Sequence, residues 1–325
     1  MSGWSFRDWR ALLPLREATL LVALLLVTLV VSIISHGAFW DPVNLRAMMV
    51  TAAITAIPAT GMTIVILTGG IDVSIGSILG LVAAICGIAF EAHWPLWIVM
   101  PMFGVIGGVL GAINAAIILP GRVPPVVATL GTLSIYRMCV FLVTGSNWIT
   151  TIPGALTTIF ISSRIWVFPV ASVLALLLMA IVAFLLQRHK TGRHIYAIGN
   201  NDEAARLSGV RVTLIRAGSY VGLGICTGFA ALLQLGQSPL VQTSTGTGFE
   251  LTVIAAVVLG GTELAGGRGS ILGTLLGTLI VGLVTDAIVL MHIQPFWGGV
   301  ILGLIILASV GAGRRGGGES VKGMA

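Results

Sequence analysis

The stretch AMMVTAAITAIPATGMTIVILTGGI, residues 47–71, contains no charged side chain over its whole length. An α-helix rises 1.5 Å per residue, so about 20 apolar residues cross the roughly 30 Å of hydrocarbon in a lipid bilayer. Lipid offers no hydrogen-bond partner to an unpaired backbone group, and a segment that crosses it therefore has to be helical. The stretch predicts a transmembrane α-helix.

Comparable apolar runs recur along the whole chain, which has 325 residues, 57% of them hydrophobic and only 9% charged. A soluble domain carries about 25% charged residues, so this composition excludes a soluble globular protein. We expect an all-α, polytopic membrane bundle of about ten transmembrane helices, with a partly buried extra helix between residues 144 and 165. The ten spans are expected at 17–36, 46–68, 73–91, 95–119, 124–143, 166–187, 216–236, 248–262, 270–290 and 295–312.

The basic residues indicate the orientation of the bundle, because cytoplasmic loops of membrane proteins carry an excess of lysine and arginine. With the N-terminus in the cytoplasm, all but three of the 17 lysines and arginines fall in cytoplasmic segments, the exceptions being Arg46, Arg137 and Arg164. This bias predicts an N-in, C-in topology. The expected parts are a cytoplasmic tail at 1–16, a single membrane domain at 17–312 with a cytoplasmic loop at 188–215, and a cytoplasmic tail at 313–325.

The net charge of +6 does not indicate a nucleic-acid partner, because the basic residues lie in short clusters between apolar runs. The cysteines, Cys86, Cys139 and Cys226, lie inside apolar runs without paired spacing, and the five histidines show no metal-ligand spacing. No local set of residues suggests catalysis. The sequence therefore predicts a protein without enzyme activity, metal or other cofactor, and argues against a membrane-embedded enzyme.

Two glycine-rich junctions resemble one another. The pentapeptide GSILG occurs at 76–80 and again at 269–273, and a glycine pair and an acidic residue, Asp72 or Glu263, precede it each time. Internal duplication is usual in transporters, and paired interrupted segments often mark the pathway. Chance similarity in a chain with 43 glycines is the alternative. At the Asp72 junction, Ser74 is placed to cap the next helix. The junction is expected to be either a broken helix that lines the pathway or contacts a partner, or else a capped cytoplasmic turn.

The loop at 188–215 predicts a short helix outside the membrane. Asn201 supplies N-cap chemistry, Asp202 and Glu203 favour the positive end of the helix dipole, and Gly209 can supply a left-handed stop. The apolar residues of this helix have no evident core of their own. The helix is therefore expected either to dock in a groove on another protein or to rest on the lipid surface.

Several motifs, in this order, carry a resemblance to the ribose-type permease family of ATP-binding-cassette (ABC) importers, over about residues 40–312. The motifs are LTGGIDVSIG (67–76), VATLGTL (127–133), TGRHIYAIGNNDEAARLSG (191–209), IAAVVLGG (254–261) and GGRGS (266–270). Glu263 departs from the small residue usual in the family. The stretch VTGSNWITTIP (143–153) looks closer to rhamnose and autoinducer-2 permeases.

The resemblance implies a permease subunit in the bacterial inner membrane that moves a monosaccharide or sugar-like molecule by alternating access. It also implies a second permease copy or a sister permease, ABC ATPase subunits and a periplasmic sugar-binding protein as partners. The chain itself has no phosphate-binding loop for ATP. The segment expected to couple to the ATPase comprises Asn201, Asp202, Glu203, Ala204, Ala205, Arg206, Leu207 and Gly209.

Polar residues inside the predicted membrane domain are the candidates for the translocation pathway, because such residues normally face water or the bundle interior. Arg137 is expected either to form an ion pair with Asp286 or Glu250 or to line a polar pathway. In the alternative class, an ion-coupled secondary transporter, the acidic residues would be ion sites, but such a carrier needs no docking helix. The candidates are Asp72, Ser74, Asn114, Arg137, Trp148, Glu250 and Asp286.

Overall fold

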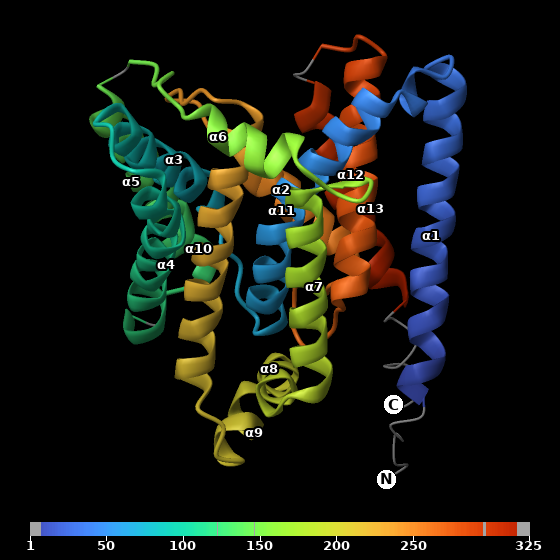
Figure 1. The fold of residues 1–325 in the computed structure, drawn as a ribbon. Helices are drawn as coiled ribbons and strands as arrows, with labels where there is room; N and C mark the ends of the chain where they lie inside the picture. Colours follow the sequence, from blue (N-terminus) through green and yellow to red (C-terminus); the bar gives the residue numbers. More distant parts are fainter. Residues whose placement is uncertain (1–7, 122, 146, 295–296, 317–325) are drawn as a thin grey trace.

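A computed structural model describes the backbone of residues 8–316, apart from residues 122, 146, 295 and 296. Its long helices form one bundle (Figure 1). They are α1 (Asp8–Ile34), α2 (Pro42–Leu67), α3 (Ile75–Glu91), α4 (Leu96–Gly121), α5 (Pro125–Thr144), α7 (Val170–Arg188), α10 (Val212–Gln237), α11 (Phe249–Leu259), α12 (Ile271–Leu290) and α13 (Trp297–Gly316).

These helices confirm the predicted all-α membrane bundle. Within the described residues, seven helices are long and apolar enough to cross a membrane, and three shorter apolar helices, Ile75–Glu91, Phe249–Leu259 and Trp297–Leu307, accompany them. Each helix coincides with one predicted span, although α1 already begins at Asp8, within the predicted N-terminal tail. The number of spans and the N-in orientation remain predictions.

The segment between α5 and α7 holds the partly buried extra helix. It comprises a short α6 (Gly154–Leu156), which continues as a π-helical turn η2 (Thr157–Ser162), and a two-stranded antiparallel ribbon of β1 (Arg164–Ile165) and β2 (Phe168–Pro169). Leu156 and Phe160 are buried, and the Thr157 hydroxyl donates to the Gly236 carbonyl at 2.7 Å. The segment lies across one end of the bundle (Figure 1).

Helix α2 forms the centre of the bundle. The most apolar window of α2 is 83% buried, and the helix packs against α7, α10, α11 and α12. Helix α1 is the opposite case, since its window is only 6% buried and it packs mainly on α12 and on the short η1 (Ala38–Trp40). An apolar helix left so open is suited to contact with lipid.

Helices α4 and α10 approach at backbone distance. A Cβ atom on Gly224 of α10 would meet the carbonyl oxygen of Gly107 on α4, and a Cβ atom on Gly107 would meet that of Gly224. Small residues at such crossings let helix backbones pack closely in a membrane, where van der Waals contact drives association. By contrast, Gly222 of α10 faces open space, so spacing by itself does not identify a packing glycine.

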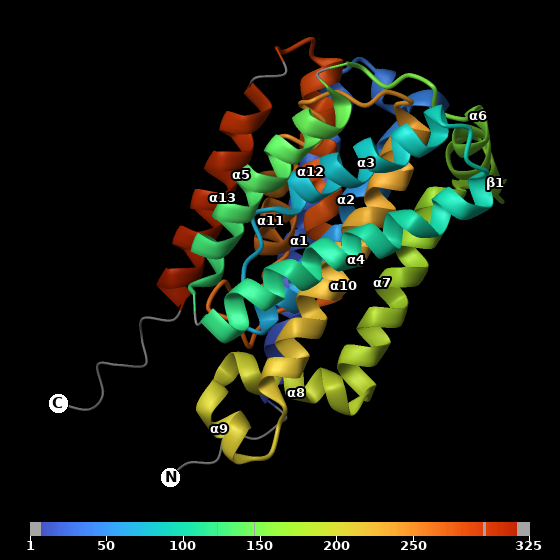
Figure 2. The same ribbon diagram turned by 90° about the vertical axis from the view of Figure 1, so that its left-hand side faces the viewer.

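Two short helices, α8 (Lys190–Asn200) and α9 (Asp202–Leu207), project from one end of the bundle (Figures 1 and 2). The sequence predicted α9 but not α8. Glycines disfavour helix, and α8 contains Gly192 and Gly199. Tertiary packing overrides this propensity, because both glycines lie against backbone, Gly192 against Leu186 and Gly199 against Leu67 and Gly267.

Candidate functional site

The polar segment SPLVQTSTGTG, residues 238–248, separates α10 from α11 at the end of the bundle away from α8 and α9. Gly246 and Gly248 adopt positive φ angles of 78° and 81°, which suit glycine and turn the chain into α11. Val241 forms a two-way backbone bridge with Ile149, at 3.0 and 3.1 Å, which holds the segment against the α5–α6 connection.

A cavity of about 1020 Å³ opens beside this segment. Its walls come from the ends of α10 and α12, the starts of α11 and α13, Leu79 of α3 and the segment itself. Among the side chains that the structure describes, the lining holds no Asp, Glu, Lys or Arg; its polar groups are amides, hydroxyls and one imidazole. The polar lining residues are Gln234, Ser238, Gln242, Ser244, Thr245, Thr247, Thr252, Thr285, His292 and Gln294.

Gln234 is a lining residue whose amide is available to a ligand. It is half-buried in α10, and within the described part of the chain its side chain has no hydrogen-bond partner. The Gln237 amide one turn later is in a different position, since its Nε2 donates to Thr51 Oγ1 at 2.9 Å and it does not line the cavity. An amide offers both donors and an acceptor, so Gln234 can bind a hydroxyl group in either direction.

Of the two alternatives expected for Arg137, a direct ion pair with Asp286 or Glu250 does not form among the described residues, although the charge of Glu250 still acts on the guanidinium. Arg137 Nη1 donates to the carbonyl oxygens of Thr243, at 3.3 Å, and Thr245, at 2.6 Å, and so fixes the polar segment from behind the cavity. Asp286 instead accepts a hydrogen bond from Asn44 Nδ2 at 3.0 Å. One carboxylate oxygen of Glu250 is buried without a hydrogen-bond partner among the described residues, and it lies against Gly76 of α3.

Three other predicted pathway residues form a buried cluster at the start of α3. Asp72 accepts hydrogen bonds from the backbone N–H of Ser74 at 2.8 Å, from the Ser74 hydroxyl at 2.6 Å and from Asn114 Nδ2 at 2.8 Å. Tyr136 completes the cluster by donating to Asn114 Oδ1 at 3.1 Å. Asp72, Ser74 and Asn114 are each fully buried, so the cluster ties the junction between α2 and α3 to α4 and α5.

The hydrogen bonds of this cluster determine the structure of the junction after α2. The sequence predicted that the Ser74 side chain caps α3, and this prediction is wrong. The Ser74 hydroxyl is hydrogen-bonded to the Asp72 carboxylate instead. The junction is a sharp break in which the acid is satisfied by protein groups. Trp148, in contrast, is 66% exposed. None of the seven predicted pathway residues lines the cavity beside α10.

The predicted caps of α9 are confirmed at both ends. The Asn201 side chain accepts from the backbone N–H of Ala204 at 3.0 Å, and Gly209 has a φ of 80°. Burial alone would raise the pKa of the Asp202 carboxyl, but hydrogen bonds and charges from Arg206 and Arg216 outweigh it and hold this pKa below its usual range. Asp202 is therefore a charged acceptor that joins α9 to α10.

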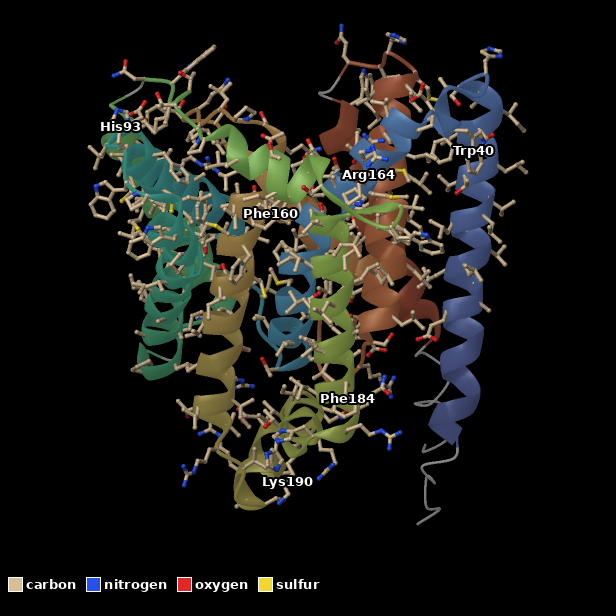
Figure 3. The ribbon with its side chains drawn as sticks, in the orientation of Figure 1. Trp40, His93, Phe160, Arg164, Phe184 and Lys190 are labelled. Carbon is tan, nitrogen blue, oxygen red and sulfur yellow. The ribbon has the colours of Figure 1, made fainter. Side chains whose placement is uncertain are left out.

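Only part of the predicted docking surface of α9 is exposed. Ala205 is buried against Ile198 of α8 and Val212 of α10, which corrects the expectation that the apolar residues here lack a core. Leu207, on the other hand, is 85% exposed. The region is strongly basic around Lys190, as the nitrogen-tipped side chains at the lower end of Figure 3 show. The exposed Leu207, on a helix that is capped at both ends, is the strongest candidate contact for another protein.

The sequence did not reveal Gln234, the cavity or α8. The available signal for the cavity was the run of Gln, Ser, Thr and Gly at 242–248, which breaks an otherwise apolar region at a membrane boundary. The amide of Gln234 could not be distinguished from that of Gln237 without knowing which helix face each occupies.

Comparison with known proteins gives consistent matches. The family model described as "Branched-chain amino acid transport system / permease component" matches residues 44–310. The ribose import permease protein RbsC of Haemophilus influenzae is 34% identical over 292 residues, 89% of this chain and 90% of its own. The autoinducer 2 import system permease protein LsrC of Photorhabdus luminescens is 34% identical over 295 residues, which cover 90% of this chain and 88% of the relative. LsrC of Yersinia pseudotuberculosis is 35% identical over 292 residues, which cover 90% of this chain and 83% of the relative. No solved structure matches the chain.

Proposed function

This chain belongs to the family of branched-chain amino acid transport system permease components, and from that premise we propose that it is the membrane-spanning subunit of an ABC importer for an uncharged monosaccharide or sugar-like molecule. It is a multi-pass protein of the bacterial inner membrane and a transport subunit, with ATP hydrolysis carried out by partner ATPase subunits. A second permease copy or a sister permease and a periplasmic sugar-binding protein complete the assembly.

The lining of the cavity beside α10 is the observation that carries the substrate class. Amides and hydroxyls, such as those of Gln234, Gln242 and Thr245, suit a molecule rich in hydroxyl groups. An amino acid would bring an ammonium and a carboxylate into the membrane domain, and the described lining offers no charged side chain to either. Burying such charges without partners is costly, which favours a neutral substrate like those in the names of the ribose and autoinducer 2 relatives.

The end of the bundle that carries α8 and α9 supports ATP-driven coupling. Leu207 and the smaller Ala204 are exposed on a helix whose Ala205 is packed against α8 and α10, so the helix is held in place and still presents an apolar contact. Docking of this helix in an ATPase groove follows the usual helix-in-groove mode. The transporter then alternates between outward-facing and inward-facing states as the ATPases close and open. The buried Asp72 cluster and the loop anchored by Arg137 support the walls of the pathway in this scheme.

Reconstitution tests the proposal directly. The permease is placed in proteoliposomes with the ATPase and binding protein of its own transport system, and uptake of radiolabelled ribose and rhamnose is measured. We expect uptake of at least one of these sugars with ATP, none with a non-hydrolysable analogue, and no loss when ionophores collapse the proton and sodium gradients. Uptake that needs an ion gradient and no ATP would instead establish the secondary transporter.

Replacing Gln234 with leucine is expected to raise the KM for the transported sugar about threefold to tenfold, because one or two hydrogen bonds to substrate hydroxyls are lost. The measurement is initial uptake rate against sugar concentration. Gln237→Leu is the matched control, since it makes the same change one turn away and outside the cavity. Equal KM values for the two variants would remove Gln234 from the substrate site.

A further inference from the structure

The two glycine-rich breaks, residues 68–74 between α2 and α3 and residues 260–270 between α11 and α12, meet each other near α8. The backbone N–H of Gly267 in the second break donates to the Leu67 carbonyl, at the end of α2, at 3.0 Å. Gly266, with a φ of 91°, lies against Gly69, so that a Cβ atom there would come within 3.1 Å of the Gly69 nitrogen. The two breaks thus form a single seam of backbone.

Helix α8 is seated on this seam. Gly199 lies so close that a Cβ atom would collide with both the Leu67 carbonyl oxygen and the Gly267 nitrogen. The Tyr196 hydroxyl donates to the Gly269 carbonyl of the second break at 3.0 Å. Burial raises the pKa of the Tyr196 phenol, a group that is already protonated at neutral pH and able to donate.

Helix α9 is joined to the first break through Arg216. The Arg216 guanidinium donates from Nη1 to Asp202 Oδ2 at 3.0 Å and from Nε to the Thr68 carbonyl at 3.1 Å. A guanidinium has a fixed fork of donors, so it can hold two acceptors in one geometry. The unit of α8 and α9 is therefore bonded to both breaks, through Tyr196 on one side and Arg216 on the other.

Each break leads to a wall of the cavity at the opposite end. The first break opens α3, whose Gly80 packs against the Thr245 carbonyl, and Thr245 lines the cavity. The second break opens α12, whose Val284 and Thr285 line the same cavity. A helix is stiff along its axis, so a displacement at either break is delivered to the cavity as movement of a whole helix.

We propose that the seam of the two breaks is the transmission element of the transporter, and that Tyr196 and Arg216 are positioning residues that pass movement of α8 and α9 to α3 and α12 together. This inference rests on the proposed function as an ATP-driven importer. The contacts couple α9 to two separate walls of the pathway, so that both move in one step. Loss of one contact would leave ATPase docking intact and weaken the link between hydrolysis and transport.

The test is the number of sugar molecules transported per ATP hydrolysed, measured in proteoliposomes of the complete transporter. For Tyr196→Phe we expect this ratio to fall roughly threefold to tenfold, with ATPase co-purification and hydrolysis retained, because one hydrogen bond across the seam is lost. Tyr220→Phe is the matched control, since the buried Tyr220 hydroxyl has no hydrogen-bond partner in the described structure. Gly199→Ala, compared with Gly218→Ala in open space, is expected to reproduce the loss.

The outcomes separate the two proposals. A wild-type ratio in Tyr196→Phe, or an equal fall in Tyr220→Phe, overturns the transmission seam while the importer function stands. Loss of the ATPase from Tyr196→Phe assigns this residue to docking and also overturns the seam. Failure of the wild-type assembly itself to transport sugar with ATP contradicts the proposed function.

Discussion

Leu207→Asp is expected to abolish sugar uptake and to remove the ATPase subunits from the purified permease, while the permease itself stays folded in the membrane. The side chain is 85% exposed, so the substitution costs the isolated subunit little. In a docked complex the same position would bury an unpaired carboxylate in an apolar groove. Central apolar contacts of this kind contribute about 2–4 kcal/mol, which predicts that ATPase affinity falls at least about 30-fold.

Two further variants make this result interpretable. Leu207→Met keeps an apolar side chain of similar volume and is expected to retain both the ATPase and uptake. Ala205→Asp places its charge in the buried contact with Ile198 and Val212, and it is expected to lower the thermal unfolding temperature as well. If Leu207→Asp keeps the ATPase bound at wild-type affinity, α9 is not the docking helix; if it loses the ATPase and still takes up sugar, transport is not driven by ATP.

The spans could be predicted from the sequence because the relevant physical quantity is local. An apolar run long enough to cross lipid, such as residues 47–71, has to be helical wherever its neighbours lie, and the helix α2 follows. Helix α8 depends instead on contacts of its glycines with backbone outside the helix, Gly192 with the nearby Leu186 of α7 and Gly199 with the distant Leu67 and Gly267. Those contacts exist only in the folded chain, so the unfavourable propensity of glycine misled the prediction.

The site was less predictable for a related reason. The sequence predicted either an acidic partner for Arg137 or a place in the pathway lining, whereas the fold supplies two backbone carbonyl oxygens, from Thr243 and Thr245. Every residue carries such an acceptor, so composition gives no indication of which ones converge on a cation. The same holds on α9, where Ala205 and Leu207 look equally apolar in sequence but only tertiary packing decides which one stays exposed.

Asp72→Ala is expected to destabilise the permease by about 3–5 kcal/mol. The reason is that the substitution removes the one group that accepts hydrogen bonds from both Ser74 and Asn114. All three groups are buried; the Ser74 N–H and hydroxyl would lose their acceptor, whereas Asn114 Nδ2 would keep its hydrogen bond to Ser74 Oγ at 2.8 Å. The consequence is a loosened junction between α2 and α3, seen as a thermal unfolding temperature lowered by about 10 °C in detergent.

The cluster also allows a test by exchange of donor and acceptor. Asp72→Asn alone places an amide N–H₂ where Asn114 Nδ2 or Ser74 now donates, so we expect about half of the loss found for Asp72→Ala. Adding Asn114→Asp restores one acceptor opposite one donor, and the double variant is expected to be more stable than Asp72→Asn. Asp286→Asn is the comparison outside the cluster, because Asp286 is only partly buried and, within the described part of the chain, accepts a hydrogen bond from Asn44 alone. The contrary outcome is that Asp72→Asn and Asp286→Asn lower the unfolding temperature equally and that the double variant recovers none of the lost stability. In that case the cluster does not hold the junction. The break after α2 then derives its rigidity from the backbone seam with Gly266 and Gly267.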